Sequence, residues 1–101
     1  MENKVDWIAE RSLVMVVTST GERVNLLVQI GRPYWIEVDS QAACDVRIEG
    51  LMPEAKRSYG IDPFQAIQSS MIFIDSYLSG VAKKNQIEWP DGELYIESES
   101  K

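Results

Sequence analysis

The chain has 101 residues, of which 45% are hydrophobic and 26% charged, and its formal net charge is −6. This length and composition are typical of a single globular domain, so we expect residues 1–101 to form one domain. The acidic balance provides no basic surface for phosphates, which argues against nucleic acid and anionic membranes as partners. Because no long apolar run or signal peptide is visible, we expect a cytoplasmic protein that does not insert into a membrane.

The first half of the chain contains four short β-type runs separated by turn-forming residues. These runs cover residues 5–17, 24–30, 34–38 and 44–49. Hydrophobic and polar residues alternate in the second and fourth runs, as in half-buried strands. The end of the first run is almost wholly apolar, which suits a strand that is covered on both faces or central in its sheet. Successive strands with tight connections predict an antiparallel four-stranded meander.

A long amphipathic helix is predicted over about residues 62–84. Its hydrophobic residues recur at spacings of three and four, at Phe64, Ile67, Met71, Ile74, Leu78 and Val81. A stripe with this period is typical of a helix that packs one face against a sheet. The segment before the helix, residues 51–61, has the composition of a loop.

The C-terminal part is predicted to add a short strand or hairpin. Pro90-Asp91-Gly92 is a turn signal within residues 87–96, and it leaves open whether they form a hairpin or one edge strand. Residues 97–101 are polar and acidic, and we expect them to fray. The fold class predicted for the whole chain is therefore α+β, a four-stranded meander packed by one helix.

The start of the predicted helix carries capping signals. Asp62 suits the N-cap, and Pro63 suits the first helical position, where its missing N–H is tolerated. Gln65 can return a hydrogen bond to the cap backbone, which completes a capping box. Gly60 is expected to supply an unusual backbone angle for the entry into the helix.

Catalytic and metal-binding chemistry finds little support in this composition. The chain has no histidine and one cysteine, which excludes Cys-His and Ser-His nucleophiles and a zinc site. No phosphate-binding loop or dinucleotide fingerprint appears, so we expect no cofactor, no metal and no enzyme activity. Carboxylate-only hydrolysis remains an alternative, because two of the acidic residues could pair in space, although the spacing selects no two of them. Cys44 is interpreted as a small buried hydrophobe, with a reactive thiol as the alternative.

Two binding hypotheses remain open. The first is a non-enzymatic protein-interaction module, such as an accessory or immunity-like protein, with Trp35 and Ile72 as exposed anchors for a partner protein or for a homodimer. The second is a small-ligand pocket near the helix start, formed by Arg57, Tyr59 and Gln68, in which Arg57 pairs with a carboxylate.

Several short motifs occur in an order that resembles a family of small bacterial proteins, a domain of unknown function. These motifs are Ala9-Glu10-Arg11, Ile30-Gly31-Arg32-Pro33, the run from Cys44 to Leu51, and a YGxDxxQA helix start from Tyr59 to Gln68. The resemblance spans most of the chain. It implies a shared fold and a bacterial source, and it implies no activity or functional residues.

Overall fold

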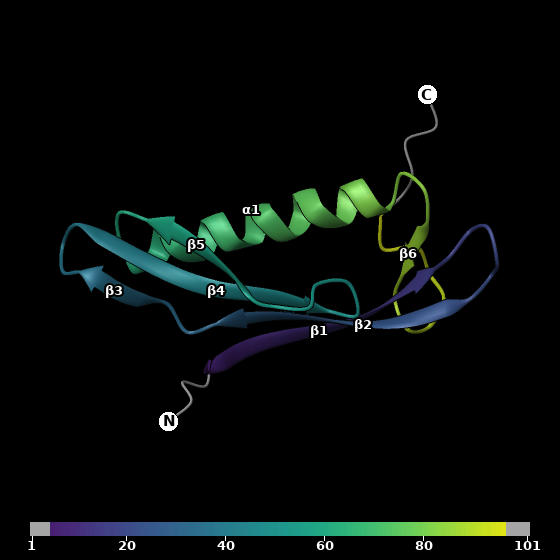
Figure 1. The fold of residues 1–101 in the computed structure, drawn as a ribbon, viewed down its shortest axis with the longest axis horizontal. Coiled ribbons are helices and arrows are strands. Elements are labelled where there is room, and N and C mark those ends of the chain that lie inside the picture. The colour runs from purple at the N-terminus through teal and green to yellow at the C-terminus, as the bar shows by residue number, and fades with distance from the viewer. Residues whose placement is uncertain (1–4, 97–101) are drawn as a thin grey trace.

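The computed structural model describes residues 5–96, and the tail predicted at residues 97–101 lies outside this range. A six-stranded sheet forms one layer, and one helix lies against one face of it (Figure 1). The elements follow in the order β1 (Trp7–Val16), β2 (Arg23–Gly31), β3 (Tyr34–Glu37), β4 (Gln41–Glu49), β5 (Lys56–Gly60), α1 (Pro63–Val81) and β6 (Gln86–Glu88).

The prediction of a four-stranded meander packed by one long helix is wrong. The sheet has six antiparallel strands and is curled, and strands account for 45% of the structure against 21% for the helix, so the molecule is mainly sheet. β5 forms within residues 51–61, which we expected to be a loop, and α1 ends at Val81 instead of residue 84. The chain remains a mixture of helix and sheet.

β5 escaped prediction because its sequence, Lys-Arg-Ser-Tyr-Gly, contains almost no hydrophobic residue. Ser58 lies opposite Cys44 on β4, and Gly60 lies opposite Ala42, so the side of β5 that faces α1 needs only small residues. Arg57 and Tyr59 alternate with them on the other side of the sheet. The strand is therefore specified by its neighbours on β4 and by the helix, and not by its own hydrophobic pattern.

β4 joins the two halves of the sheet because both of its edges are paired. β5 pairs with one edge, at Ala42–Val46, whereas β2 and β3 share the opposite edge. β2 and β3 thus act as one bent strand, interrupted where Pro33 cannot donate a hydrogen bond to the ladder. β1 lies beside β2, and β6 pairs only with the last three residues of β1.

The face of the sheet that contacts α1, which we call the inner face, carries the main core. The buried members of this core are Leu13, Leu26, Val28, Val46, Ile48, Met52, Ile74, Leu78, Ala82 and Ile87. Each large aliphatic side chain buried in this way contributes roughly 1.5–3 kcal/mol. The opposite face, which we call the outer face, carries no second layer within residues 5–96 (Figure 1).

The orientation of α1 differs from the predicted stripe. Its buried residues are Ala66, Ser70, Ile74 and Leu78. Phe64 and Met71, which we expected to be buried, are 71% and 53% exposed. The helix is rotated because small residues let its first turns approach the sheet closely: Ala66 packs with Ala42 and Cys44 in a second core cluster. Phe64 and Met71 are turned outward as a result.

The helix start has the geometry of an N-cap. Asp62 is extended, with φ −150°, and its Oδ1 accepts a hydrogen bond from the backbone N–H of Gln65 at 2.8 Å. Pro63 is the first helical residue. The Gln65 side chain accepts from the N–H of Ile61 at 2.8 Å, one residue before the cap. This return bond therefore differs by one residue from the predicted capping box.

The expectation of an unusual backbone angle at Gly60 is wrong. Among the glycines of residues 5–96, positive φ occurs at Gly21, Gly50 and Gly92, and Gly60 is not one of them. Gly60 is instead a position of close approach, because a Cβ atom there would lie 2.5 Å from the backbone nitrogen of Ala66.

Replacing Asp62 by alanine is expected to lower the free energy of unfolding by about 1 kcal/mol, because the N–H of Gln65 loses its acceptor. The measurement is urea denaturation followed by circular dichroism. Asp62→Asn is the matched control, because asparagine also caps well and should retain most of the stability. Equal losses for both variants would show that the cap hydrogen bond is not the cause.

The C-terminal segment combines features of the two predicted alternatives. β6 has three residues, and a turn follows in which the N–H of Trp89 donates to the carbonyl of Glu93 at 2.8 Å. Leu94 then forms an isolated antiparallel bridge with Glu88. The segment is therefore a short edge strand with a minimal hairpin behind it.

Candidate functional site

The structure does not bring Arg57, Tyr59 and Gln68 together. Arg57 and Tyr59 lie on β5 opposite Asp45 and Ala43, so both belong to the outer face of the sheet. Gln68 is exposed on α1, which covers the inner face. Because the sheet separates the two groups, the predicted pocket at the helix start is not formed by these three residues.

Arg57 instead lines a cavity of about 480 Å³ on the outer face, together with Val5, Asp6, Arg32, Pro33, Tyr34 and Asp45. Its Nε donates to Asp45 at 3.4 Å, and its guanidinium lies 5.8 Å from the centre of the Tyr34 ring. Arg32 donates to Asp6 at 2.8 Å. Both arginines of this cavity are therefore already paired with a carboxylate.

Two groups at this cavity have shifted protonation equilibria. Burial, followed by the Asp45 carboxylate, raises the pKa of Tyr34, so its hydroxyl stays protonated at neutral pH. The Tyr34 oxygen and then Asp45 raise the pKa of Arg57, whose guanidinium is charged at any physiological pH. The charged side chains that line the cavity form two ion pairs, Arg57 with Asp45 and Arg32 with Asp6.

Cys44 is fully buried between the sheet and α1. Its thiol donates to the carbonyl oxygen of Gly31 at 3.3 Å, and burial raises the pKa of the thiol. A buried thiol with a raised pKa is a poor nucleophile. Within residues 5–96, no three metal-binding side chains come together, and no helix combines the length and hydrophobicity needed to cross a bilayer.

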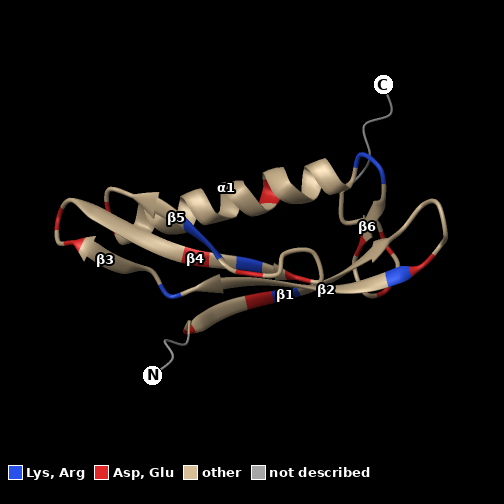
Figure 2. Cartoon of the chain, viewed as in Figure 1, with Lys and Arg blue, Asp and Glu red and all other residues tan. Residues whose placement is uncertain are grey.

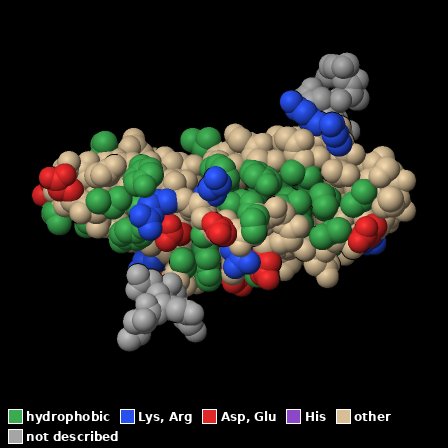
Figure 3. All heavy atoms as spheres, in the orientation of Figure 1, with side chains coloured by type: hydrophobic (Ala, Val, Ile, Leu, Met, Phe, Trp, Pro, Cys, Tyr) green, Lys and Arg blue, Asp and Glu red, His purple; other side chains and the backbone are tan. Residues whose placement is uncertain are grey.

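The two proposed anchors lie on different elements. Trp35 is on β3 opposite Ala42, which places it on the inner face, and it is 37% exposed. All four residues of β3 are exposed. Ile72 lies on α1 and is 66% exposed. Figure 3 shows that hydrophobic side chains gather at the end of the molecule that carries β3 and β5, and in a band along its middle.

The solvent side of α1 is almost free of charge. Its exposed residues are Phe64, Gln65, Gln68, Met71, Ile72, Asp75, Ser76, Ser79 and Gly80. Asp75 is the one charged residue of the helix (Figure 2). A surface helix normally carries charged residues on its solvent side, whereas the centres of protein interfaces are depleted of charge and enriched in methionine. The composition of this surface resembles that of an interface.

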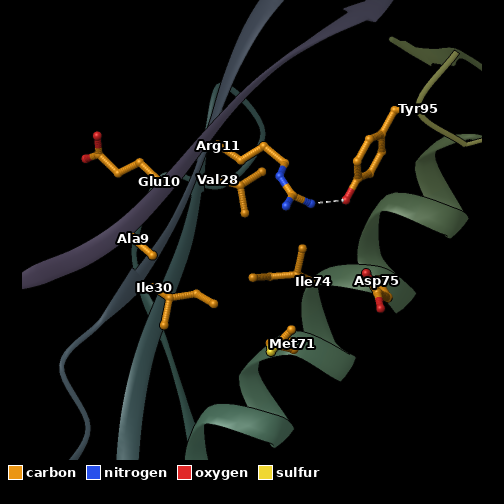
Figure 4. A pocket seen from close by; sticks show the side chains of 9 residues that line it. All are labelled: Ala9, Glu10, Arg11, Val28, Ile30, Met71, Ile74, Asp75 and Tyr95. Carbon is orange, nitrogen blue, oxygen red and sulfur yellow. Dashed lines mark hydrogen bonds between the residues drawn. The ribbon is translucent and has the colours of Figure 1, made fainter. Parts of the chain in front are cut away.

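A groove opens between α1 and β1 because the helix lies over β4 and β5 and leaves the β1 side of the inner face uncovered. We call it the β1 groove. It encloses about 140 Å³ and is lined by Ala9, Glu10, Arg11, Val28, Ile30, Met71, Ile74, Asp75 and Tyr95. In Figure 4, Ile30 and Ile74 point toward each other across the groove, whereas Glu10 points away from it.

Arg11 closes one end of the β1 groove. Its guanidinium donates to the hydroxyl of Tyr95 at 2.8 Å (Figure 4). The same group lies 5.3 Å from the ring centre of Trp89 and 5.6 Å from that of Tyr95, within the range of cation–π attraction. Arg11 forms no ion pair within residues 5–96.

The strand beside this groove has a free edge. β1 pairs with β2 from Trp7 to Val16, with a register shift between Trp7 and Ala9, but β6 covers its other edge only at Val14–Val16. In the described part of the chain, no strand pairs with the other edge of residues 7–13. Their outward-pointing N–H and C=O groups therefore present an unoccupied ladder.

Sequence reasoning missed both the free edge and Arg11. For the apolar end of the first run, the structure favours the central position over coverage on both faces, since Val14 is flanked by β2 and β6. The signal for the edge was the adjacent pair Glu10-Arg11 inside a β-type run, because natural edge strands carry charges.

Comparison with known proteins supports the resemblance drawn from the short motifs. A family model described as a domain of unknown function, DUF6968, matches residues 9–97. The searches of curated proteins and of solved structures returned no match. The matched range begins in β1 and includes both walls of the β1 groove. The family shown by this match carries no established activity, and the chain belongs to it: the domain of unknown function DUF6968.

Proposed function

We propose that this chain is a non-enzymatic protein-interaction module whose partner docks on the solvent side of α1 and the neighbouring β1 groove. The observation that carries the proposal is the near absence of charge from the exposed side of the helix, where Asp75 is the single charged residue. On a chain with a net charge of −6, this surface stands apart from the rest.

Hydrophobic exposure on the same helix supports the proposal. Phe64, Met71 and Ile72 are each more than half exposed. A lone exposed apolar residue is ordinary, whereas several beside an open groove are typical of a contact surface. Burial of such side chains in an interface removes apolar area from water without stranding charges, which makes docking favourable.

We further propose a cytoplasmic bacterial setting and a role like that of accessory or immunity proteins. The net charge of −6 would steer a basic partner towards the chain and speed the encounter. The solvent side of α1, with Asp75 as its single charged residue, would then form the contact itself. If net charge guides the encounter and the helix surface forms the contact, the association rate should fall with salt. The dissociation rate should depend on the residues of the helix surface.

The small-ligand alternative has weaker support. Its best location is the outer-face cavity beside Arg57, which has room for a small molecule. A carboxylate ligand would have to displace Asp45 from Arg57 or Asp6 from Arg32. The cost of separating those pairs places this function second.

Ile72→Glu is expected to abolish partner binding while leaving the fold intact, because the side chain is 66% exposed and a charge would be desolvated in the interface. To find the partner, a photo-reactive residue replaces Met71 in cells of the natural host, and adducts are identified by mass spectrometry. The Ile72→Glu change should remove the adduct.

Val38→Glu is the matched control, because Val38 is 69% exposed but lies outside α1. It should leave the adduct unchanged. An adduct of twice the chain mass, together with conversion of a dimer to a monomer by Ile72→Glu in light scattering, would identify the partner as a second copy. The proposal is wrong if no adduct forms at position 71, or if the adduct still forms in the Ile72→Glu variant.

A further inference from the structure

We infer that the β1 groove receives an extended segment of a partner protein, which adds to the sheet along residues 7–13 of β1 and places a carboxylate against Arg11. This inference rests on the proposed function, because it names the chemistry of the partner at the same site. Three independent features of the site support it: a backbone edge, an apolar groove and a cation.

The backbone edge determines the shape of the occupant. Residues 7–13 of β1 are hydrogen-bonded to β2 on one side, and nothing within residues 5–96 pairs with the other side. An extended peptide satisfies such an edge with main-chain hydrogen bonds, a common mode of peptide recognition. A helix or a globular surface would leave these N–H and C=O groups unpaired.

The groove determines the pattern of side chains. Side chains of a strand point alternately to the two faces of the sheet. In a segment added beside β1, every second residue would therefore project over the inner face, towards Ile30, Met71 and Ile74. The walls of the groove seen in Figure 4 are aliphatic at these positions, so these alternate residues should be hydrophobic.

The guanidinium of Arg11 determines the charge expected on the partner segment. Arg11 shares the inner face with the groove, and the guanidinium has five N–H donors, of which one donates to Tyr95. The guanidinium carbon lies 5.3 Å from the ring centre of Trp89 and 5.6 Å from that of Tyr95, and cation–π attraction to both rings restrains it. A guanidinium held in this way is preorganised for a carboxylate. Asp75, on the helix wall, would repel a carboxylate placed elsewhere in the groove.

Two other roles for the charged edge of β1 are protection against aggregation and pairing with a second copy of the chain. A charge on an edge strand can simply guard against edge-to-edge aggregation, in which case no peptide should bind. A second copy of the chain could also pair through β1. Antiparallel registers centred on Glu10 or on Arg11 would then place like charges opposite each other, which is destabilising.

The test uses synthetic peptides in which valine alternates with threonine over about seven residues, matching the length of the free edge. One peptide carries a central glutamate on the valine side, and matched peptides carry glutamine or lysine there. Affinities are measured by NMR titration of the full chain. Amide hydrogen exchange of β1 is followed in the same samples.

We expect the glutamate peptide to bind about fivefold more tightly than the glutamine peptide, and the lysine peptide to bind most weakly. Amides on the free edge of β1 should become protected. Arg11→Gln should remove the difference between the peptides, and Arg11→Lys should retain only part of it. Arg32→Gln, which changes an arginine of the outer face, should behave as the natural chain does.

Equal affinities for the three peptides, no binding, or binding without protection of β1 would each overturn the inference. If the protection of β1 grows with protein concentration and the measured molecular mass is that of a dimer, the edge pairs with a second copy of the chain. That result would also overturn the inference. A different experiment decides the proposed function. Crosslinks from Met71 that are lost in Ile72→Glu would uphold docking on α1 even if the peptides do not bind.

Discussion

Replacing Gly60 by alanine is expected to destabilise the fold by about 3 kcal/mol. The added Cβ would lie 2.5 Å from the nitrogen of Ala66 and 2.7 Å from the carbonyl carbon of Gln65. Both are backbone atoms of the first helical turns, which cannot move aside as the end of a flexible side chain could. The clash would push the start of α1 away from β5 and open the small-residue cluster around Cys44.

Gly80→Ala is the matched control for this prediction. Gly80 lies in α1, and a Cβ built there meets no atom within 4 Å apart from its chain neighbours and the backbone of its own helix. Alanine in a helix is favoured over glycine by up to about 1 kcal/mol, so this variant should be more stable than the natural chain. Denaturant midpoints of the two variants should move in opposite directions. A neutral Gly60→Ala would refute close approach as the role of this glycine.

Ile87→Ala is expected to cost about 3 kcal/mol, although β6 has only three residues. Ile87 is completely buried and lies opposite Met15 in the main core. Ile87 is the one β6 residue in the main core, and its truncation leaves a cavity there. The measurement is the free energy of unfolding in urea, with the chain unchanged elsewhere.

Ile72→Ala is the control for Ile87→Ala, because the same atoms are removed from a side chain that is 66% exposed. Its effect should lie within about 0.5 kcal/mol of zero. If Ile87→Ala were equally mild, β6 would contribute little to the core. The C-terminal segment would then be an accessory to the sheet and not part of it.

The elements that the sequence predicted are those whose own residues carry the signal. Alternation marked β2 and β4, and a capping residue with a proline marked the start of α1. β5 and the rotation of the helix had no such signal. Both depend on small residues, Gly60, Ala42 and Ala66, that meet only after folding. Small residues give no periodic signal in a hydrophobic pattern. The spacing of the large hydrophobic residues therefore placed Phe64 and Met71 on the wrong side of the helix.

The site was harder to predict than the fold. Arg57, Tyr59 and Gln68 are neighbours in the sequence, but a strand and a helix turn them to opposite sides of one sheet. Arg11 and Tyr95 are 84 positions apart, and nothing local links them. A site whose residues come from several strands can be predicted only if the strand order is known. No single β-type run in the sequence reveals that order.

The pairing of β6 with β1 has a consequence for the order of folding. The β1–β2, β3–β4 and β4–β5 ladders join strands that are consecutive in the chain, so they can close early at little entropic cost. β6 must instead close the loop formed by the rest of the domain. We therefore expect it to dock last and to detach first. Each detachment would extend the bare edge of β1 from residues 7–13 to residues 7–16, exposing an apolar template for aggregation until the last strand returns.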